Sequence, residues 1–257
     1  MGSFAGFLAG LLGIGGGVIL VPLFLWLFPI AGFPSDLIVH TAFGTSLAII
    51  LPTAISSTLG HRKQGNVDWH MVGFLALGGI LGSFLGSSAA AIIPGEKLKV
   101  CLGLMQIVIS LKLLCYHPYI PPENLVRAKR TSLVLVGLVG GLFSAFFGMG
   151  GGVIAVPLML IVLHLPIHLA VGNSSALIVV SSFSAVICYA WYGLQNPGST
   201  PFSFGYVNIL VAIIVAPLTI IFARIGVKLA SITSQAKLAK IFAVLLMIVG
   251  IKILLQG

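Results

Sequence analysis

Long runs of apolar residues, separated by short polar stretches, dominate the chain. A helix needs about 20 apolar residues to cross the hydrocarbon core of a bilayer. Eight runs reach that length, at approximately 3–28, 36–60, 68–93, 96–116, 131–164, 166–192, 204–230 and 235–256. The stretches between them contain proline, glycine and charged residues, which are typical of loops. The pattern predicts an all-α polytopic membrane protein.

Composition supports the same class. Of the 257 residues, 59% are hydrophobic and only 7% are charged, whereas a soluble domain carries about 25% charged residues. The net charge of +9 lies in short clusters beside apolar runs, as in cytoplasmic loops next to an anionic leaflet. We therefore expect the lipid bilayer, and no nucleic acid, as a partner, and a multi-pass protein of the bacterial inner membrane.

The chain contains two copies of one four-segment unit. Residues 117–130, with three prolines and several charges, form the predicted cytoplasmic linker between repeat 1 (1–116) and repeat 2 (131–257). Landmarks recur in the same order in both units: Gly13 with Gly148, Phe43 with Val171, Val67 with Val207, Lys97 with Lys237 and Lys112 with Lys252. Such a match over most of the chain indicates an internal repeat.

Three consecutive glycines interrupt the first segment of each unit, in the motifs Gly13-Ile-Gly-Gly-Gly-Val-Ile-Leu-Val-Pro22 and Gly148-Met-Gly-Gly-Gly-Val-Ile-Ala-Val-Pro157. Glycine costs roughly 1 kcal/mol in a helix interior, and proline removes a backbone donor, so the motifs predict helix breaks. The helix that starts after each break offers free N–H groups to anions. If both breaks face one cavity near the midplane, the backbone donors come from Gly15, Gly16, Gly17, Gly150, Gly151 and Gly152.

Other glycines have a simpler interpretation. Gly2, Gly6 and Gly10 recur every four residues, as do Gly78, Gly82 and Gly86. This spacing places small residues on one helix face and is typical of closely packed helices in membranes. The same packing role is the alternative interpretation of the triple glycines.

The distribution of basic residues favours an inverted second repeat. If all eight segments cross the membrane, the 13 Lys and Arg residues divide seven against six. If the first segment of each repeat turns back, they divide ten against three, the excess expected of a cytoplasmic face. We therefore predict two inverted four-segment repeats, each with its first segment broken or re-entrant at the glycine motif.

A second pair of matching motifs supplies small polar side chains, Gly44-Thr-Ser46 and Gly172-Asn-Ser-Ser175. The hydroxyl and amide groups of Thr45, Ser46, Asn173 and Ser174 can donate hydrogen bonds to an oxyanion without adding charge. Their alternative role is hydrogen bonding between helices. Under the binding interpretation, Asn173→Leu abolishes anion binding and leaves the protein folded.

The few acidic residues indicate the charge of the substrate. Asp36, Asp68, Glu96 and Glu123 all fall at segment ends or in loops, whereas cation pumps and proton relays keep carboxylates inside their spans. The pathway therefore suits a small organic or inorganic anion. No nucleophile motif, metal-ligand spacing or dinucleotide fingerprint is present, so we expect no enzyme activity, catalytic residue, metal or cofactor.

Taken together, the glycine motifs, the Gly-Thr-Ser and Gly-Asn-Ser motifs and the loop His61-Arg-Lys-Gln-Gly-Asn-Val-Asp-Trp69 resemble the sulfite exporter TauE/SafE family over essentially the whole chain. The resemblance implies movement of sulfur-containing anions such as sulfite, sulfoacetate and other sulfonates, and some members are assigned to other small carbon compounds. The second copy departs from the first, because Asn173 replaces a threonine and Asn208 replaces an aspartate.

These observations predict a secondary transporter of small sulfur-containing oxyanions that works by alternating access. An anion-selective channel, a transporter of a non-sulfur organic anion and a non-transporting membrane receptor stay open as alternatives, because the same donors would bind an anion in each. Formation of a homodimer also stays open.

Overall fold

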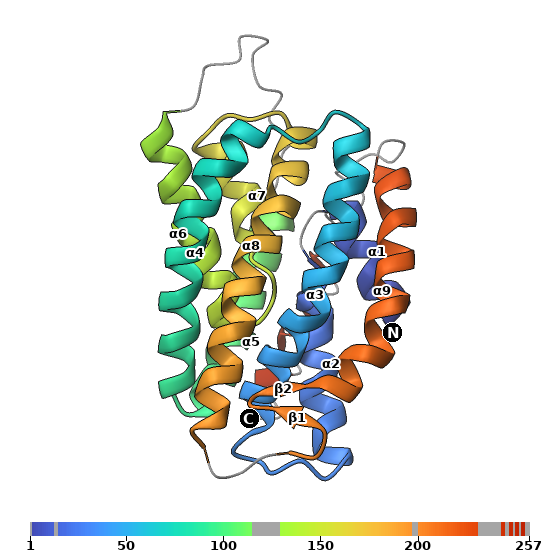
Figure 1. Ribbon diagram of the computed structural model, residues 1–257, viewed down its shortest axis with the longest axis vertical. Coiled ribbons are helices and arrows are strands. Elements are labelled where there is room, and N and C mark those ends of the chain that lie inside the picture. The colour runs from blue at the N-terminus through green and yellow to red at the C-terminus, as the bar shows by residue number, and fades with distance from the viewer. Residues whose placement is uncertain are drawn as a thin grey trace.

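The computed structural model describes residues 2–12, 15–114, 129–196 and 200–230, with the short pieces 243–244, 247–248, 250–251 and 253–254. Nearly all of these residues are helical (Figure 1). The elements are α1 (Gly2–Leu12), α2 (Gly17–Ile30), α3 (Ile38–Lys63), α4 (Trp69–Ile92), α5 (Gly95–Leu114), α6 (Arg130–Phe146), α7 (Gly152–Ile161), α8 (Ile167–Leu194), β1 (Ser203–Phe204), β2 (Val207–Asn208) and α9 (Ile209–Ala230). Most of the predicted linker 117–130 and of the predicted segment 235–256 lies outside the described residues.

Four helices in the described part of the chain are long and apolar enough to cross a membrane: Ile38–Lys63, Trp69–Ile92, His168–Leu194 and Ile209–Leu229. Large apolar side chains on their outer faces are exposed, for example Phe84 on α4 at 57% and Ile213 on α9 at 65%. Such faces fit hydrocarbon better than water. The predicted all-α membrane class is confirmed at this level.

The glycine motifs break the first segment of each half into two helices, α1 and α2, and α6 and α7. Gly15, Gly16, Gly150 and Gly151 all have φ between 65° and 82°, a left-handed region that side chains with a Cβ adopt at a cost. Gly16 and Gly151 are the N-caps of α2 and α7. The two prolines lie inside the new helices and not at the break.

Predicted segment 204–230 begins with a short hairpin and not with a helix. Ser203 pairs with Asn208 and Phe204 with Val207 across a turn that contains Gly205 at φ 60°. Asn208 then accepts a hydrogen bond from the backbone N–H of Val211 at the start of α9.

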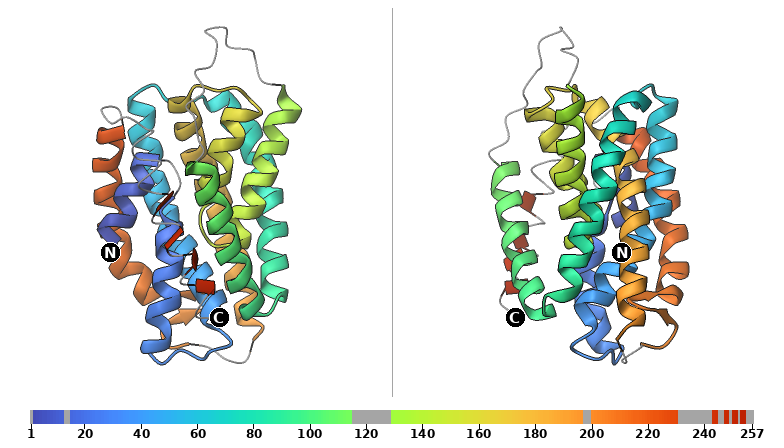
Figure 2. Two further views of the ribbon diagram at one scale, coloured as in Figure 1. Left: turned by 180° about the vertical axis from the view of Figure 1, so that it is seen from behind. Right: turned by 60° about the vertical axis from the view of Figure 1, so that its left-hand side comes forward.

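Glycines bring two helix pairs into close contact, as the four-residue spacing predicts. A Cβ added to Gly6 would lie 2.3 Å from the carbonyl oxygen of Thr219, so α1 packs directly on the backbone of α9. On α4, a Cβ at Gly82 would lie 2.0 Å from the carbonyl oxygen of Leu138 on α6. Both pairs lie side by side in Figures 1 and 2.

The long helices α3 and α8 cross at the centre in opposite directions. Ser57, near the end of α3, shares a hydrogen bond with Ser175 near the start of α8, whereas Gly44, near the start of α3, contacts Tyr189 near the end of α8. The ends of α3 and α9 lie together with the start of α4, because Gln64 donates to the Val227 carbonyl oxygen and the Arg62 guanidinium lies 5.9 Å from the centre of the Trp69 ring.

Candidate functional site

The two glycine breaks meet at the centre of the molecule. A Cβ added to Gly15 would lie 3.5 Å from the Cα of Gly150, and one added to Gly17 would lie 2.6 Å from the Cα of Met149. The two backbones therefore approach at van der Waals distance, which only glycine allows here. Gly15, Gly17 and Gly150 lie at this contact, whereas a Cβ added to Gly16 would meet the backbone of Ala5 on α1 and one added to Gly151 would meet that of Gly140 on α6.

Two isoleucines, which sequence reasoning missed, pack against both breaks. The side chains of Ile50 on α3 and Ile178 on α8 each lie 3.1–3.5 Å from the Cβ positions of Gly15 and Gly150. Both isoleucines are buried, at 0% and 1% exposure. No sequence signal separates them from other apolar residues of a span, because they become special only through their contact with the breaks.

The start of α2 and α7 determines which backbone donors are available there. The first intrahelical donors are Ile19, to the carbonyl oxygen of Gly16, and Ile154, to that of Gly151. The amides of Gly17 and Val18 precede that ladder and have no intrahelical acceptor. Gly152 differs from the prediction, because its N–H already donates to the carbonyl oxygen of Gly150 at 2.8 Å.

Thr45 and Asn173 both accept hydrogen bonds from backbone N–H groups of the other half of the chain. Thr45 Oγ1 accepts from the backbone N–H of Asn208 at 2.9 Å, and Asn173 Oδ1 accepts from that of Asp68 at 2.8 Å. Each bond ties the residue that precedes a long helix, α9 or α4, to a helix of the other half. The interpretation as interhelical hydrogen bonding, which the sequence left open, describes these two contacts.

Ser46 and Ser174 occupy the helix face that leads to the breaks. Each precedes one of the two isoleucines by four residues, so it lies on the same face about 6 Å along the axis. Both serines are completely buried. Within the described part of the chain the Ser46 hydroxyl has no hydrogen-bond partner, and it is therefore available to donate to a ligand.

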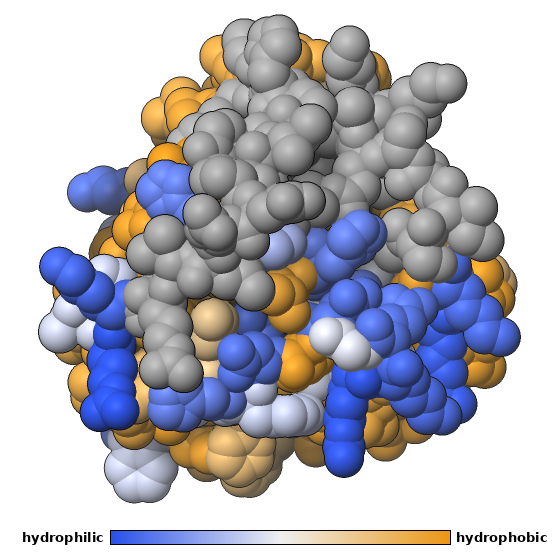
Figure 3. All heavy atoms as spheres, turned by 90° about the horizontal axis from the view of Figure 1, so that it is seen from above, coloured by the Kyte–Doolittle hydropathy of each residue, from blue (hydrophilic) through white to orange (hydrophobic). Residues whose placement is uncertain are grey.

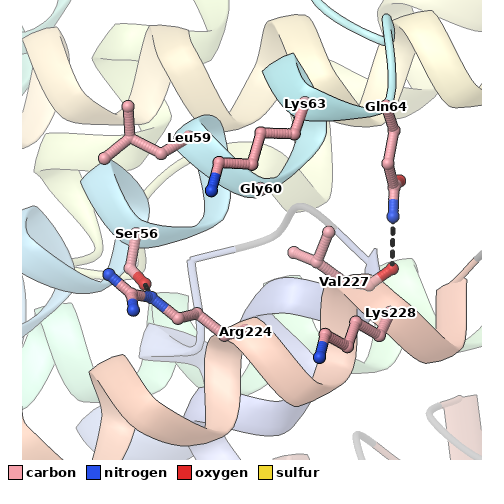
Figure 4. A pocket seen from close by; sticks show the side chains of 8 residues that line it. All are labelled: Ser56, Leu59, Gly60, Lys63, Gln64, Arg224, Val227 and Lys228. Carbon is pink, nitrogen blue, oxygen red and sulfur yellow. Dashed lines mark hydrogen bonds between the residues drawn. The ribbon is translucent and has the colours of Figure 1, made fainter.

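A basic cavity of about 470 Å³ opens between the ends of α3 and α9, and the sequence did not reveal it (Figure 4). Arg224 Nε donates to Ser56 Oγ at 3.2 Å inside it. Its lining residues are Ser56, Leu59, Gly60, Lys63, Gln64, Arg224, Val227 and Lys228. A charged residue within an apolar membrane segment often has a function, and Arg224 lies within such a segment.

A cavity of about 460 Å³ at the opposite end of α3 has the opposite character, because Asp36, Glu96, His40 and Tyr206 contribute to its lining. His40 Nε2 donates to the carbonyl oxygens of Ala90 and Ile93, which ties α3 to the end of α4. Burial, reinforced by the charge of Asp36, raises the pKa of the Tyr206 hydroxyl. The linings of the two cavities therefore differ in charge.

Apolar helices long enough to span a bilayer, packed around two broken helices that meet at the centre, define a multi-pass membrane protein of the transporter class. The model of the family described as "Sulfite exporter TauE/SafE" matches residues 1–253. The chain belongs to the TauE/SafE sulfite exporter family.

Similar proteins carry matching names. A "Probable membrane transporter protein" of Haemophilus influenzae is 30% identical over 100% of this chain and 96% of its own length. Relatives of the same description from Methanocaldococcus jannaschii and Bacillus subtilis are 28% and 24% identical to this chain. The matches cover 93% and 96% of the lengths of these relatives. No solved structure matches the chain. These names indicate a membrane transporter, which fits a protein that is not an enzyme.

Proposed function

We propose that the protein is a secondary transporter of small sulfur-containing oxyanions, such as sulfite, sulfoacetate or other sulfonates, in a bacterial inner membrane. The observation that carries the proposal is the meeting of the two glycine breaks beside Ile50 and Ile178. There the positive ends of α2 and α7 converge, and a helix N-terminus that is excluded from water attracts an anion.

The position of the carboxylates supports an anion and not a cation. Among the described residues, Asp36 precedes α3, Asp68 caps α4 and Glu96 lies in the first turn of α5. None of them lies in the middle of a long helix. The sulfur class of the anion rests on the family, whose printed description names sulfite.

Contacts that recur between the halves support inverted repeats. Gly44 contacts Tyr206 as Gly172 contacts Asn66, and Gly2 contacts Val215 as Gly137 contacts Leu75. The bond from Asn208 to Thr45 has its counterpart in the bond from Asp68 to Asn173. The same three shifts in residue number relate the two members of every pair of contacts. A shift of 128 positions relates α3 to α8, one of 135 relates α1 to α6, and one of 140 relates the region of α4 to that of α9. Because α3 and α8 run in opposite directions, we infer that the second repeat is inverted.

In this proposal the first segment of each repeat is re-entrant, and access alternates between the two faces. Ile50 and Ile178 close the space between the breaks in the conformation described here. Movement of one of them away from the breaks would expose the amides of Gly17 and Val18, with the Ser46 hydroxyl, to one side of the membrane at a time.

Flux measurements in proteoliposomes test the proposal. We expect saturable flux of sulfoacetate, at turnover rates far below those of free diffusion, and weak competition by malonate, in which a carboxylate replaces the sulfonate. Flux that rises linearly with concentration would instead indicate a channel. Equal competition by malonate would assign the site to organic anions in general and overturn the sulfur specificity.

A further inference from the structure

We propose that the basic cavity between α3 and α9 is a binding site for one tetrahedral oxyanion at the cytoplasmic mouth of the pathway. The inference deepens the proposed function and rests on it for the identity of the anion. The site is separate from the glycine breaks, because it is formed by the last turns of α3 and α9.

The lining of this cavity is basic. Lys63 extends from α3 toward Ser56 and the Arg224 guanidinium (Figure 4), and none of the described residues that line the cavity is a carboxylate. Asp68 lies at the same end of the molecule, but its carboxylate accepts hydrogen bonds from the amides of His70 and Met71. An oxyanion beside Ser56 would therefore meet the cations of Arg224 and Lys63.

Helix ends explain the two lysines but not the arginine. Cations near a helix C-terminus are favourable in any helix, and basic residues gather on a cytoplasmic face. Figure 3 shows hydrophilic side chains, in blue, over part of this end of the molecule. Arg224 lies six residues before the end of α9 and is held by the almost buried Ser56 through Nε. This contact leaves the Nη1 and Nη2 edge of the guanidinium for two parallel bonds to sulfonate oxygens.

The internal repeat shows that the cavity is specific to one face. The shifts that relate the halves place Phe84 at the position equivalent to Arg224 and Trp191 at the position equivalent to Lys63. Both equivalents are uncharged and exposed, at 57% and 65%. Among the described residues, the positions equivalent to Arg224 and Lys63 therefore carry no charge, and we expect an anion to bind more tightly from the cytoplasmic side.

Hydroxyl side chains lie between the cavity and the glycine breaks. Below Ser56, the hydroxyls of Thr53 and Thr219 share a hydrogen bond of 2.6 Å across the same pair of helices. Thr53 lies only three residues from Ile50 on α3, and Ile50 contacts both breaks. An anion bound in the cavity thus lies within about three helical turns of the central site.

Isothermal titration of the detergent-solubilised protein with sodium sulfate and with ethanesulfonate, at constant ionic strength in chloride, tests the site. Arg224→Gln should weaken binding of the anion at least about tenfold, the usual range for a charge-assisted bond. The control is Arg62→Gln, which makes the same charge change at the Trp69 ring outside the cavity. It should change the binding affinity less than about twofold. A normal thermal unfolding curve for each variant shows that it is folded, and Lys63→Gln provides a second variant of the lining.

Equal loss in Arg224→Gln and Arg62→Gln would overturn the proposal, because only the general surface charge would then matter. It would also be overturned if phosphatidylglycerol, but not sulfate, binds in a manner that requires Arg224, since the cavity would then hold a lipid phosphate. Binding is measured without transport. Loss of the cavity site with flux intact therefore rejects this inference alone, and absence of flux with binding intact rejects the proposed function alone.

Discussion

Gly15 and Gly150 belong to different halves of the chain, yet a Cβ on Gly15 would lie 3.5 Å from the Cα of Gly150. Both residues have a positive φ, of 79° and 82°. The close approach brings the starts of α2 and α7 together, and the proposed anion site depends on it.

Gly15→Ala should therefore reduce transport of sulfoacetate in proteoliposomes about tenfold, the effect of about 1.4 kcal/mol, because its methyl group enters the space between the breaks. The matched control is Gly32→Ala, at φ 76° with nothing within 4 Å of its added Cβ. Both variants carry the left-handed backbone cost of about 1–2 kcal/mol. Equal transport by the two variants would show that the break is not part of the pathway.

Thr45→Val should lower stability by about 1–3 kcal/mol, because the N–H of Asn208 then loses its buried acceptor. Thr45→Ser keeps the hydroxyl and should cost less than about 1 kcal/mol. Thermal unfolding in detergent measures both. Asn173→Leu removes the equivalent acceptor for Asp68, so we expect it to destabilise the protein as well, in contrast to the expectation from sequence. Unchanged stability in both Thr45→Val and Asn173→Leu would argue against an anchoring role.

Gly82→Ala should disrupt the contact between α4 and α6, since its Cβ would lie 2.0 Å from the Leu138 carbonyl oxygen, and overpacking costs about 1–3 kcal/mol or more. Gly73→Ala on the same helix meets nothing within 4 Å and should stabilise α4 by about 0.5–1 kcal/mol. The melting temperatures of the two variants should therefore move in opposite directions. A shift in the same direction would contradict the described packing.

Ser46→Ala should leave stability within about 1 kcal/mol of the original, because the buried hydroxyl has no hydrogen-bond partner in the described part of the chain. Loss of a donor to the anion should nevertheless raise the KM for sulfoacetate several-fold. Ser110→Ala, which removes a hydroxyl bonded to the Ala243 carbonyl oxygen, serves as a control for stability alone. An unchanged KM in Ser46→Ala would remove this serine from the site.

The sequence predicted the helical membrane class and the position of both breaks, because three successive glycines in an apolar run make a continuous helix costly. It did not reveal that Thr45 and Asn173 accept hydrogen bonds from the other half of the chain, since a hydroxyl or amide side chain accepts according to the partner that the fold brings to it. Those partners lie 163 and 105 residues away. Ile50 and the cavity around Arg224 escaped prediction for the same reason, because each depends on helices that are distant in the sequence.

The central claim is that the two breaks form one anion site, and anomalous diffraction from crystals soaked in selenate tests it most directly. Selenate keeps the tetrahedral shape and charge of sulfate and scatters anomalously. We expect a peak beside the contact of the two breaks, within hydrogen-bond distance of the amides at the start of α2 or α7. A peak in the basic cavity alone, or no peak at the breaks in crystals of transport-competent protein, would contradict the claim.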